Sequence, residues 1–331
     1  MYTRRMRIVI PGGSGQVGRI LARHLSSQGH AVTVLSRQPQ AAPWRTLAWD
    51  TQTPGAWVDT LEGADVCINL AGRSVDCRYN ARNRRLIHRS RVDSTQLLNQ
   101  VVASLRNPPR VWLNAATATI YRHALDRPQD EPTGESGGNE PGAPDTWNFS
   151  IQVAKDWEAA FFETPTPRTR KLALRSAMTF SPDPGGVFDV FLKLVRFGLG
   201  GTQGSGDQFV SWIHDLDFAR AVDLLIARED LDGPIILASP NPLPNREFLR
   251  ILRQAWRTPL GLPSARWMIE IGTLLMRTES ELVLKSRRVV PTRLLEAGFH
   301  FQYPTWPEAA IDLVQRWRTQ SRRQPSPNSH P

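Results

Sequence analysis

The sequence has 331 residues, of which 40% are hydrophobic and 22% charged, a composition that excludes a disordered chain or a coiled coil and allows a sizeable core. The net charge of +10 would suit nucleic acid, but only four of the 41 basic residues are lysines. Codon composition can produce that skew, so we rank a nucleic-acid partner last. Two cysteines, Cys67 and Cys77, do not support a disulfide framework or a zinc site, and the apolar stretch Trp267–Met276 contains Glu270 and is too short to cross a bilayer. We therefore expect a cytoplasmic protein with no membrane partner.

Short apolar runs alternate with helix-like stretches over the first half of the chain. This alternation predicts an α/β fold, a Rossmann-type doubly wound parallel sheet. After Ser176 the pattern changes to loops rich in glycine and proline, followed by mainly helical segments, which predicts a smaller, mainly helical substrate-side region. The predicted strands are Arg7–Pro11, Val32–Ser36, Asp65–Leu70, Arg110–Ala115 and Lys171–Leu174.

The first predicted strand runs into a glycine-rich turn, Gly12-x-x-Gly15-x-x-Gly18, and then into a helical pattern that opens with Gln16 and Val17. Strand, turn and helix in this order are the context that a dinucleotide fingerprint requires. Gly12 permits the tight turn, Gly15 lets the backbone approach a pyrophosphate, and Gly18 lets the helix pack closely on the strand. The alternative is a glycine-rich loop without a ligand.

The second predicted strand ends in Ser36 and Arg37, where NAD-binding proteins carry a carboxylate for the ribose hydroxyls. A guanidinium beside a hydroxyl suits a phosphate at the 2′ position instead. The cofactor that we predict is therefore NADP. The alternative is that Arg37 is an ordinary surface residue of an arginine-rich protein.

Further motifs resemble the extended, atypical branch of the short-chain dehydrogenase/reductase superfamily, the epimerase-like proteins with a short uncharacterised C-terminal domain. The similarity runs from Arg7 to about Trp317. With this resemblance we divide the chain into an NADP-binding Rossmann domain (1–176), a substrate-side region interleaved with the core (177–280), a short C-terminal family domain (281–318) and a disordered tail (319–331). The motifs are Asn69-Leu70-Ala71-Gly72, Ser90-Arg91-Val92-Asp93-Ser94-Thr95, Asp156-Trp157-Glu158-Ala159-Ala160, Gly198-Leu199-Gly200-Gly201, Trp212-Ile213-His214 and Leu294-Leu295-Glu296-Ala297-Gly298-Phe299.

The resemblance also implies cofactor contacts outside the glycine turn. Leu70 and Ala71 would lie beside the adenosine and pyrophosphate, and Arg91 and Thr179 would lie near the far end of the cofactor. Trp212 and His214 would either serve the substrate region or form a strand packed beneath it.

Working members of the superfamily use a tyrosine and a lysine four residues later on one helix, so that the ammonium lowers the pKa of the phenol. No Tyr-x-x-x-Lys occurs in this sequence, and the aligned positions hold Phe149 and Val153. Lys155 lies two residues beyond the required place, about 200° around the helix. Thr117 is left as the candidate catalytic residue, at the position of a hydroxyl that orients the substrate, and Tyr121 is expected to shape the pocket.

Two functions remain open. The first is an NADP-dependent oxidoreductase or epimerase-like enzyme acting on an unidentified carbonyl or sugar-type small molecule, because positioning alone can lower a barrier greatly. The second is a catalytically reduced, NADPH-binding regulatory protein, which the missing tyrosine and lysine favour. No metal site is expected.

Overall fold

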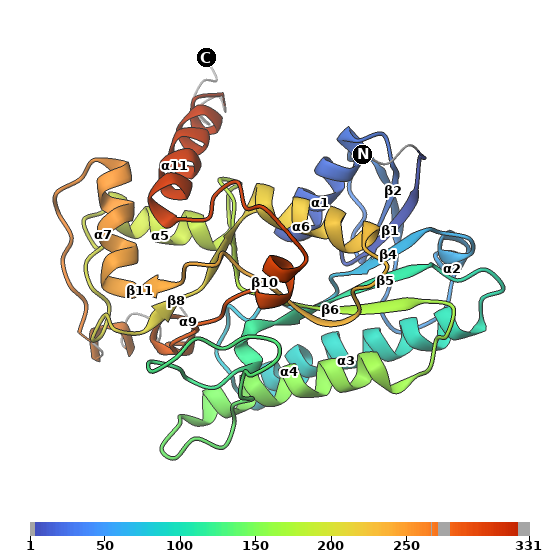
Figure 1. Cartoon of the computed structure of the whole chain (residues 1–331), viewed down its shortest axis with the longest axis horizontal. Coiled ribbons are helices and arrows are strands. Elements are labelled where there is room, and N and C mark those ends of the chain that lie inside the picture. The colour runs from blue at the N-terminus through green and yellow to red at the C-terminus, as the bar shows by residue number, and fades with distance from the viewer. Residues whose placement is uncertain (1–3, 266, 271–278, 324–331) are drawn as a thin grey trace.

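The core of the molecule is a seven-stranded parallel sheet with strand order β10-β6-β5-β4-β1-β2-β3 (Figure 1). The structure is a computed structural model, and it describes residues 4–265, 267–270 and 279–323. The strand order reverses between β1 and β4, which makes the ends of these strands a topological switch point. The predicted Rossmann-type fold is confirmed. The strands are β1 (Arg7–Pro11), β2 (Ala31–Ser36), β3 (Arg45–Ala48), β4 (Val66–Asn69), β5 (Val111–Thr117), β6 (Arg170–Ser176) and β10 (Gly233–Leu237).

Helices cover both faces of the sheet (Figure 1). On one face Ile8 and Ile10 of β1 belong to a buried cluster with the helix residues Leu21 and Leu225. On the other face Val9 packs in a second cluster around α3. The central strand is apolar on both sides because both sides are buried. The helices of this part of the molecule are α1 (Gln16–Ser27), α2 (Val58–Leu61), α3 (Ala81–Ser104), η1 (Ala118–Ile120), α4 (Asp145–Glu163) and α6 (Asp215–Ala227).

A smaller, mainly helical region lies beside the sheet, as predicted, and has an aromatic core (Figure 1). The rings of Phe248 and Trp306 are stacked with their centroids 4.4 Å apart, and Phe180 packs against both. Its strands pair as β7 with β9 and as β8 with β11. Its elements are β7 (Met178–Phe180), α5 (Val187–Arg196), β8 (Phe209–Val210), β9 (Trp212–His214), β11 (Leu243–Pro244), α7 (Asn245–Trp256), α9 (Glu281–Leu284), α10 (Thr292–Glu296) and α11 (Trp306–Arg323).

Two strands of the sheet were not predicted, β3 and β10. Strand β3 is a short edge strand without an apolar run, and β10 begins with Gly233 and Pro234, which read as a turn. Because β10 pairs with β6, the chain returns to the sheet after residue 176.

The expected disordered tail was wrong for residues 319–323, because α11 continues to Arg323. Arg318 anchors this end of the helix by donating to the carbonyl of Trp256 at 2.9 Å and by lying over its ring. Residues 324–331, and part of the stretch Trp267–Met276, lie outside the described residues.

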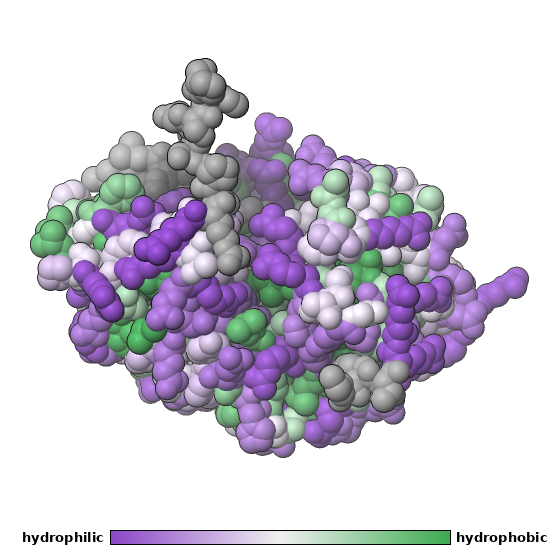
Figure 2. Space-filling model, turned by 90° about the horizontal axis from the view of Figure 1, so that it is seen from above, coloured by the Kyte–Doolittle hydropathy of each residue, from purple (hydrophilic) through white to green (hydrophobic). Residues whose placement is uncertain are grey.

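Hydrophilic residues dominate one face of the molecule, and part of its basic charge is paired with carboxylates. Hydrophilic residues cover most of the face seen in Figure 2, with hydrophobic residues in small groups between them. Several arginines of the run 78–91 pair with carboxylates, including Arg78 with Glu279 and Arg89 with Asp93. Within the described ranges, no helix combines the length and apolar character needed to cross a bilayer.

Candidate functional site

The glycine turn joins β1 to α1 and lies against the loop that follows β4. Gly12 has a φ of +73°, and a Cβ there would lie 2.6 Å from the Cα of Ala71, so only glycine fits. Gly18 packs against the backbone of Gly13, where a Cβ would also collide. A Cβ at Gly15 would meet nothing nearer than the carbonyl oxygen of Gly12 at 4.0 Å. Close backbone packing therefore requires glycine at positions 12 and 18, whereas the space beside Gly15 is open.

The N-terminus of α1 lies at this open space. Its N-cap residue, Gly15, offers no side-chain hydrogen bond, and its first turn contains no acidic residue. The free backbone N–H groups and the positive end of the helix dipole suit an anion. Nε2 of Gln16 is buried without a hydrogen-bond partner in the described part of the chain, and Val17 packs against the core beneath. These groups fit the pyrophosphate of a dinucleotide.

Ser36 and Arg37 lie at the carboxyl end of β2, beside the turn. The Ser36 hydroxyl is buried and donates to Oγ of Ser14 at 3.1 Å, which ties the end of β2 to the glycine turn. Arg37 is exposed and forms no ion pair with any residue that the structure describes. Arg37 is therefore a cation beside the glycine turn whose charge no described carboxylate neutralises, and such a guanidinium is suited to bind a 2′-phosphate.

A chain of contacts leads from the turn into a pocket. Gly12 abuts Ala71, whose backbone N–H donates to Oδ1 of Asn69 at 3.1 Å. The neighbouring Gly72 lies against Arg91, since a Cβ at Gly72 would be 3.4 Å from the guanidinium carbon. Arg91 in turn lines a cavity of about 250 Å³. The glycine turn and the cavity are therefore linked by a short run of residues in contact.

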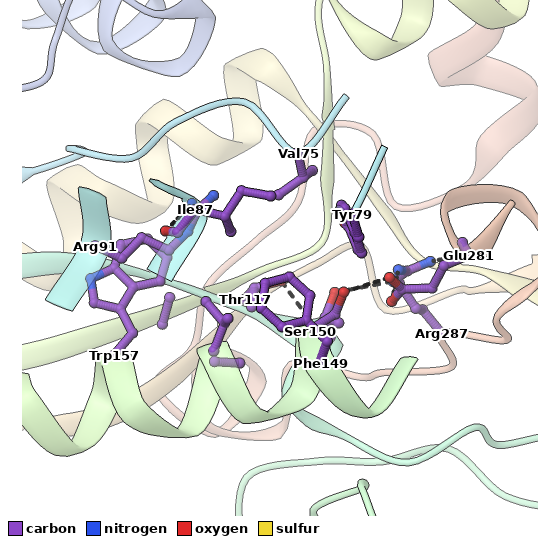
Figure 3. Close-up of a pocket in the computed structure, with 14 residues that line it drawn as sticks. Val75, Tyr79, Ile87, Arg91, Thr117, Phe149, Ser150, Trp157, Glu281 and Arg287 are labelled. Atoms are coloured by element: carbon purple, nitrogen blue, oxygen red, sulfur yellow. Dashed lines mark hydrogen bonds and ion pairs between the residues drawn. The ribbon is translucent and has the colours of Figure 1, made fainter. Parts of the chain in front are cut away.

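The cavity lies at the carboxyl end of β5, between α3, α4 and a segment near the C-terminus (Figure 3). Ligands of open α/β sheets bind outside the carboxyl ends of the strands, so this is the expected place for a substrate. Its lining residues are Val75, Tyr79, Ile87, Arg91, Ala116, Thr117, Thr119, Phe149, Ser150, Val153, Ala154, Trp157, Glu281 and Arg287.

Arg91 is a cation without a carboxylate at one end of this pocket. Its Nη1 donates to the carbonyl of Ile87 at 3.0 Å, and its guanidinium lies over the ring of Trp157, 5.2 Å from the centroid. Burial lowers its pKa to about 10. It makes no ion pair with any described residue, and an unpaired buried charge is costly. An anionic group of a ligand would relieve that cost.

The positions of the missing tyrosine and lysine face the pocket but carry no acid or base. Phe149 and Val153 line it, and Phe149 packs edge-on against Tyr79 with ring centroids 5.1 Å apart. Lys155 is no substitute, because its Nζ donates to the carbonyl of Gly137 at 2.7 Å and it does not line the cavity. Thr117 does line it, with its hydroxyl oxygen accepting from the N–H of Thr119 at 3.1 Å.

Sequence reasoning missed a polar cluster at the other end of the pocket (Figure 3). The Ser150 hydroxyl donates to Oε2 of Glu281 at 2.5 Å, and Nη2 of Arg287 lies 3.1 Å from Oε1. Burial raises the pKa of Glu281, although the neighbouring Arg287 opposes this shift. Burial also raises the pKa of the Tyr79 phenol, to about 12. Nothing in the local sequence around Glu281 shows that it reaches a helix 131 residues earlier.

Other candidate residues lie away from the pocket. Thr179 is buried in β7 and does not line it. Tyr121 was expected to shape the pocket, which was wrong, because its phenol turns to β6 and accepts a hydrogen bond from Nη1 of Arg175 at 2.7 Å. Trp212 and His214 are fully buried in β9, where Nε2 of His214 lies 2.9 Å from Oδ2 of Asp312. They form the strand beneath the substrate region.

Comparison with known proteins identifies two matching families. A model described as "NAD dependent epimerase/dehydratase family" matches residues 8–237, and one described as "Domain of unknown function (DUF1731)" matches residues 265–313. The epimerase family protein SDR39U1 of Homo sapiens is 30% identical over 314 residues, which cover 93% of this chain and all of that protein. The epimerase family protein SA0724 of Staphylococcus aureus is 27% identical over 310 residues, covering 93% of this chain and 98% of that protein.

Two solved structures are also similar. The crystal structure of human SDR39U1 (isoform 2) with NADPH superposes with a TM-score of 0.80 at 26% identity, covering 94% of this chain and 99% of that one. A nucleoside-diphosphate sugar epimerase from Corynebacterium glutamicum superposes with a TM-score of 0.72 at 26% identity, covering 98% of this chain and 63% of that one.

Proposed function

The chain belongs to the NAD dependent epimerase/dehydratase family, and from this we propose that it binds NADPH and acts as an oxidoreductase or epimerase-like enzyme on a small carbonyl or sugar-type substrate. The observation that carries the proposal is the run of contacts that leads from the glycine turn through Gly72 and Arg91 to the cavity beside Thr117. This arrangement can hold a dinucleotide at one end and bring a substrate to its reactive end. The human relative was crystallised with NADPH.

Each part of the cofactor has candidate partners. Gly15, the N-terminus of α1 and Gln16 would hold the pyrophosphate, because no side chain caps this helix end and Nε2 of Gln16 has no partner among the residues that the structure describes. Ser36 and Arg37 would hold the 2′-phosphate. The remaining candidates are Val17, Leu70 and Ala71 around the adenosine and pyrophosphate, with Arg91 and Thr179 toward the far end.

When bound, NADPH would supply a hydride to a substrate carbonyl, or NADP would accept one from an alcohol. The residues of the chain then have to orient the carbonyl and move a proton. Thr117 is suited to the first task, because its hydroxyl lies at the carboxyl end of β5 and faces the cavity.

A titration with NADPH and with NADH tests the cofactor assignment. We expect NADPH to bind more tightly, and Arg37→Asp to weaken NADPH binding at least tenfold, because only NADPH carries the 2′-phosphate. NADH binding should not weaken, because a carboxylate at this place suits the ribose hydroxyls. Arg322→Asp makes the same change of charge on an exposed residue near the end of α11 and serves as the control. Equal affinity of the unmodified protein for both cofactors would contradict the NADP assignment.

The second candidate is a catalytically reduced regulatory protein that reports on NADPH. It is favoured by Phe149 and Val153, the apolar residues that line the pocket where a phenol and an ammonium would be required. A regulatory protein would bind NADPH but oxidise none of it with any member of a broad panel of aldehydes, ketones and nucleotide sugars. Turnover that falls in Thr117→Ala would instead support the enzyme.

A further inference from the structure

The segment matched by the domain of unknown function places a carboxyl group in the pocket. We propose that Glu281, held by Ser150 and Arg287, is the acid–base group of this site and takes the place of the absent tyrosine and lysine. The C-terminal domain then completes the active site that the Rossmann domain leaves without a proton carrier. This inference rests on the function proposed above.

The other residues that line the pocket cannot perform this task. Arginine does not give up its proton in proteins, which excludes Arg91 and Arg287. The pKa of Tyr79 is raised to about 12 by burial, and no ammonium from the helix α4 lies beside it to lower that value. Among the lining residues of the described chain, Glu281 alone carries a carboxyl group.

The position of Glu281 is fixed by the residues that follow it. Lys285 donates through Nζ to the carbonyl of Thr119 at 2.9 Å, and Nε of Arg287 donates to the hydroxyl of Thr119 at 3.2 Å. The hydroxyl of Ser286 donates to the carbonyl of Ala124 at 2.6 Å. The C-terminal segment is therefore fastened to the loop that leaves β5 directly after Thr117, and Glu281 is held next to the end of that strand.

The surroundings of Glu281 favour its protonated form more than water does. The residue is 1% exposed, and removal from water favours its neutral form and raises its pKa. Arg287 and Lys285 oppose the shift, whereas Glu279 adds to it. An acid whose pKa moves toward neutrality can both donate and accept a proton, as general acid–base catalysis requires.

Ser150 connects this carboxyl group to the cavity. Its hydroxyl hydrogen-bonds to Oε2 of Glu281, and it lines the pocket one residue after Phe149. When Glu281 is protonated, the carboxyl donates to Oγ of Ser150, and the serine proton is free to point at the substrate. Reduction of a carbonyl breaks the C=O π bond and adds a hydride to carbon, for which NADPH is the source. Oγ of Ser150 gives its proton to the substrate oxygen and takes the proton of Glu281, whose carboxylate Arg287 then stabilises.

The variant that tests this assignment is Glu281→Gln, which keeps the shape of the side chain and its contacts but cannot release a proton. Glu131→Gln is the matched control, because burial also raises the pKa of Glu131, yet that carboxyl accepts from the N–H of Ile236 and does not line the pocket. The full chain is assayed in each case. The readouts are NADPH affinity, NADPH oxidation with a panel of aldehydes and ketones, and the infrared band of protonated carboxyl groups followed against pH.

We expect Glu281→Gln to bind NADPH within twofold of the unmodified protein and to lose at least a hundredfold in kcat, together with the pH dependence that a proton donor imposes. We also expect it to lose one carboxyl band that titrates above the ordinary glutamate pKa. Glu131→Gln should keep the activity and the band that Glu281→Gln removes, and should lose a separate band of its own. A Glu281→Gln variant with normal turnover, or one that loses no such band, would overturn the assignment and leave the proposed function standing. Unmodified protein that binds NADPH but oxidises none with any carbonyl would overturn the proposed function and the catalytic role of Glu281 together.

Discussion

Gly12 and Gly15 of the nucleotide turn should respond differently to substitution by alanine. Gly12→Ala forces a non-glycine residue to a φ of +73°, at a cost of about 1–2 kcal/mol. Its Cβ would also lie 2.6 Å from the Cα of Ala71, and overpacking of this kind costs roughly 1–3 kcal/mol more. We therefore expect Gly12→Ala to lose about 2–5 kcal/mol of unfolding free energy.

Gly15→Ala should leave the stability almost unchanged and damage ligand binding. Gly15 has a φ of −71° and a ψ of 175°, which any residue adopts, and its Cβ would have no neighbour within 4.0 Å other than the carbonyl oxygen of Gly12. The gain from a stiffer unfolded chain, about 0.4–1 kcal/mol, nearly offsets the loss of a good N-cap residue. If a pyrophosphate approaches this backbone, the added methyl group should weaken NADPH binding at least tenfold.

Urea denaturation and NADPH fluorescence titration of both variants separate these effects. Gly12→Ala should show a lower midpoint of unfolding, whereas Gly15→Ala should unfold with the unmodified protein and bind NADPH poorly. Unimpaired NADPH binding by Gly15→Ala would show that the pyrophosphate does not lie at this turn. A Gly12→Ala protein as stable as the parent would refute the packing argument.

Two further predictions concern buried polar residues outside the cofactor surface. Burial, with Arg287 nearby, lowers the pKa of Lys285 to about 7 in the folded protein, below its value of about 10 in the unfolded chain. As the pH falls from about 10 to 7, the unfolded chain binds a proton that the folded protein does not, so the free energy of unfolding decreases, and below pH 7 this loss stays constant. Lys285→Met lacks this group, so its stability relative to the parent should rise as the pH falls through this window, by at most roughly 1.4 kcal/mol per pH unit in thermal or urea unfolding. A stability difference that is independent of pH would contradict this. His214→Ala should lose about 2–4 kcal/mol, because it removes the bond to Asp312 and the stack on Tyr303, whose centroid is 4.0 Å away. It should not change NADPH affinity, and a selective loss of binding would show that His214 serves the site.

Local sequence determined the features whose parts are contiguous in the chain. The turn from Gly12 to Gly18 could be predicted because strand, glycine spacing and helix follow one another within a few residues. The end of β2 at Ser36 and Arg37 and the absence of any Tyr-x-x-x-Lys are equally local. By contrast, β3 and β10 were missed, because pairing with a neighbouring strand, and not an apolar run of their own, makes them strands.

Only the tertiary structure decided which distant side chains share the pocket. Arg91 belongs to an arginine-rich helix, yet it is the one arginine of the run 78–91 that lines the cavity, since the helix turns this residue toward Gly72 and Trp157. Ser150 and Glu281 are 131 residues apart, and they meet because the C-terminal segment is hydrogen-bonded to the loop after β5. A sequence shows that the usual base is missing, but a contact that depends on how the chain returns over its own sheet has no signature in the neighbouring residues. The carboxyl group that we propose in its place could therefore be found only in the folded molecule.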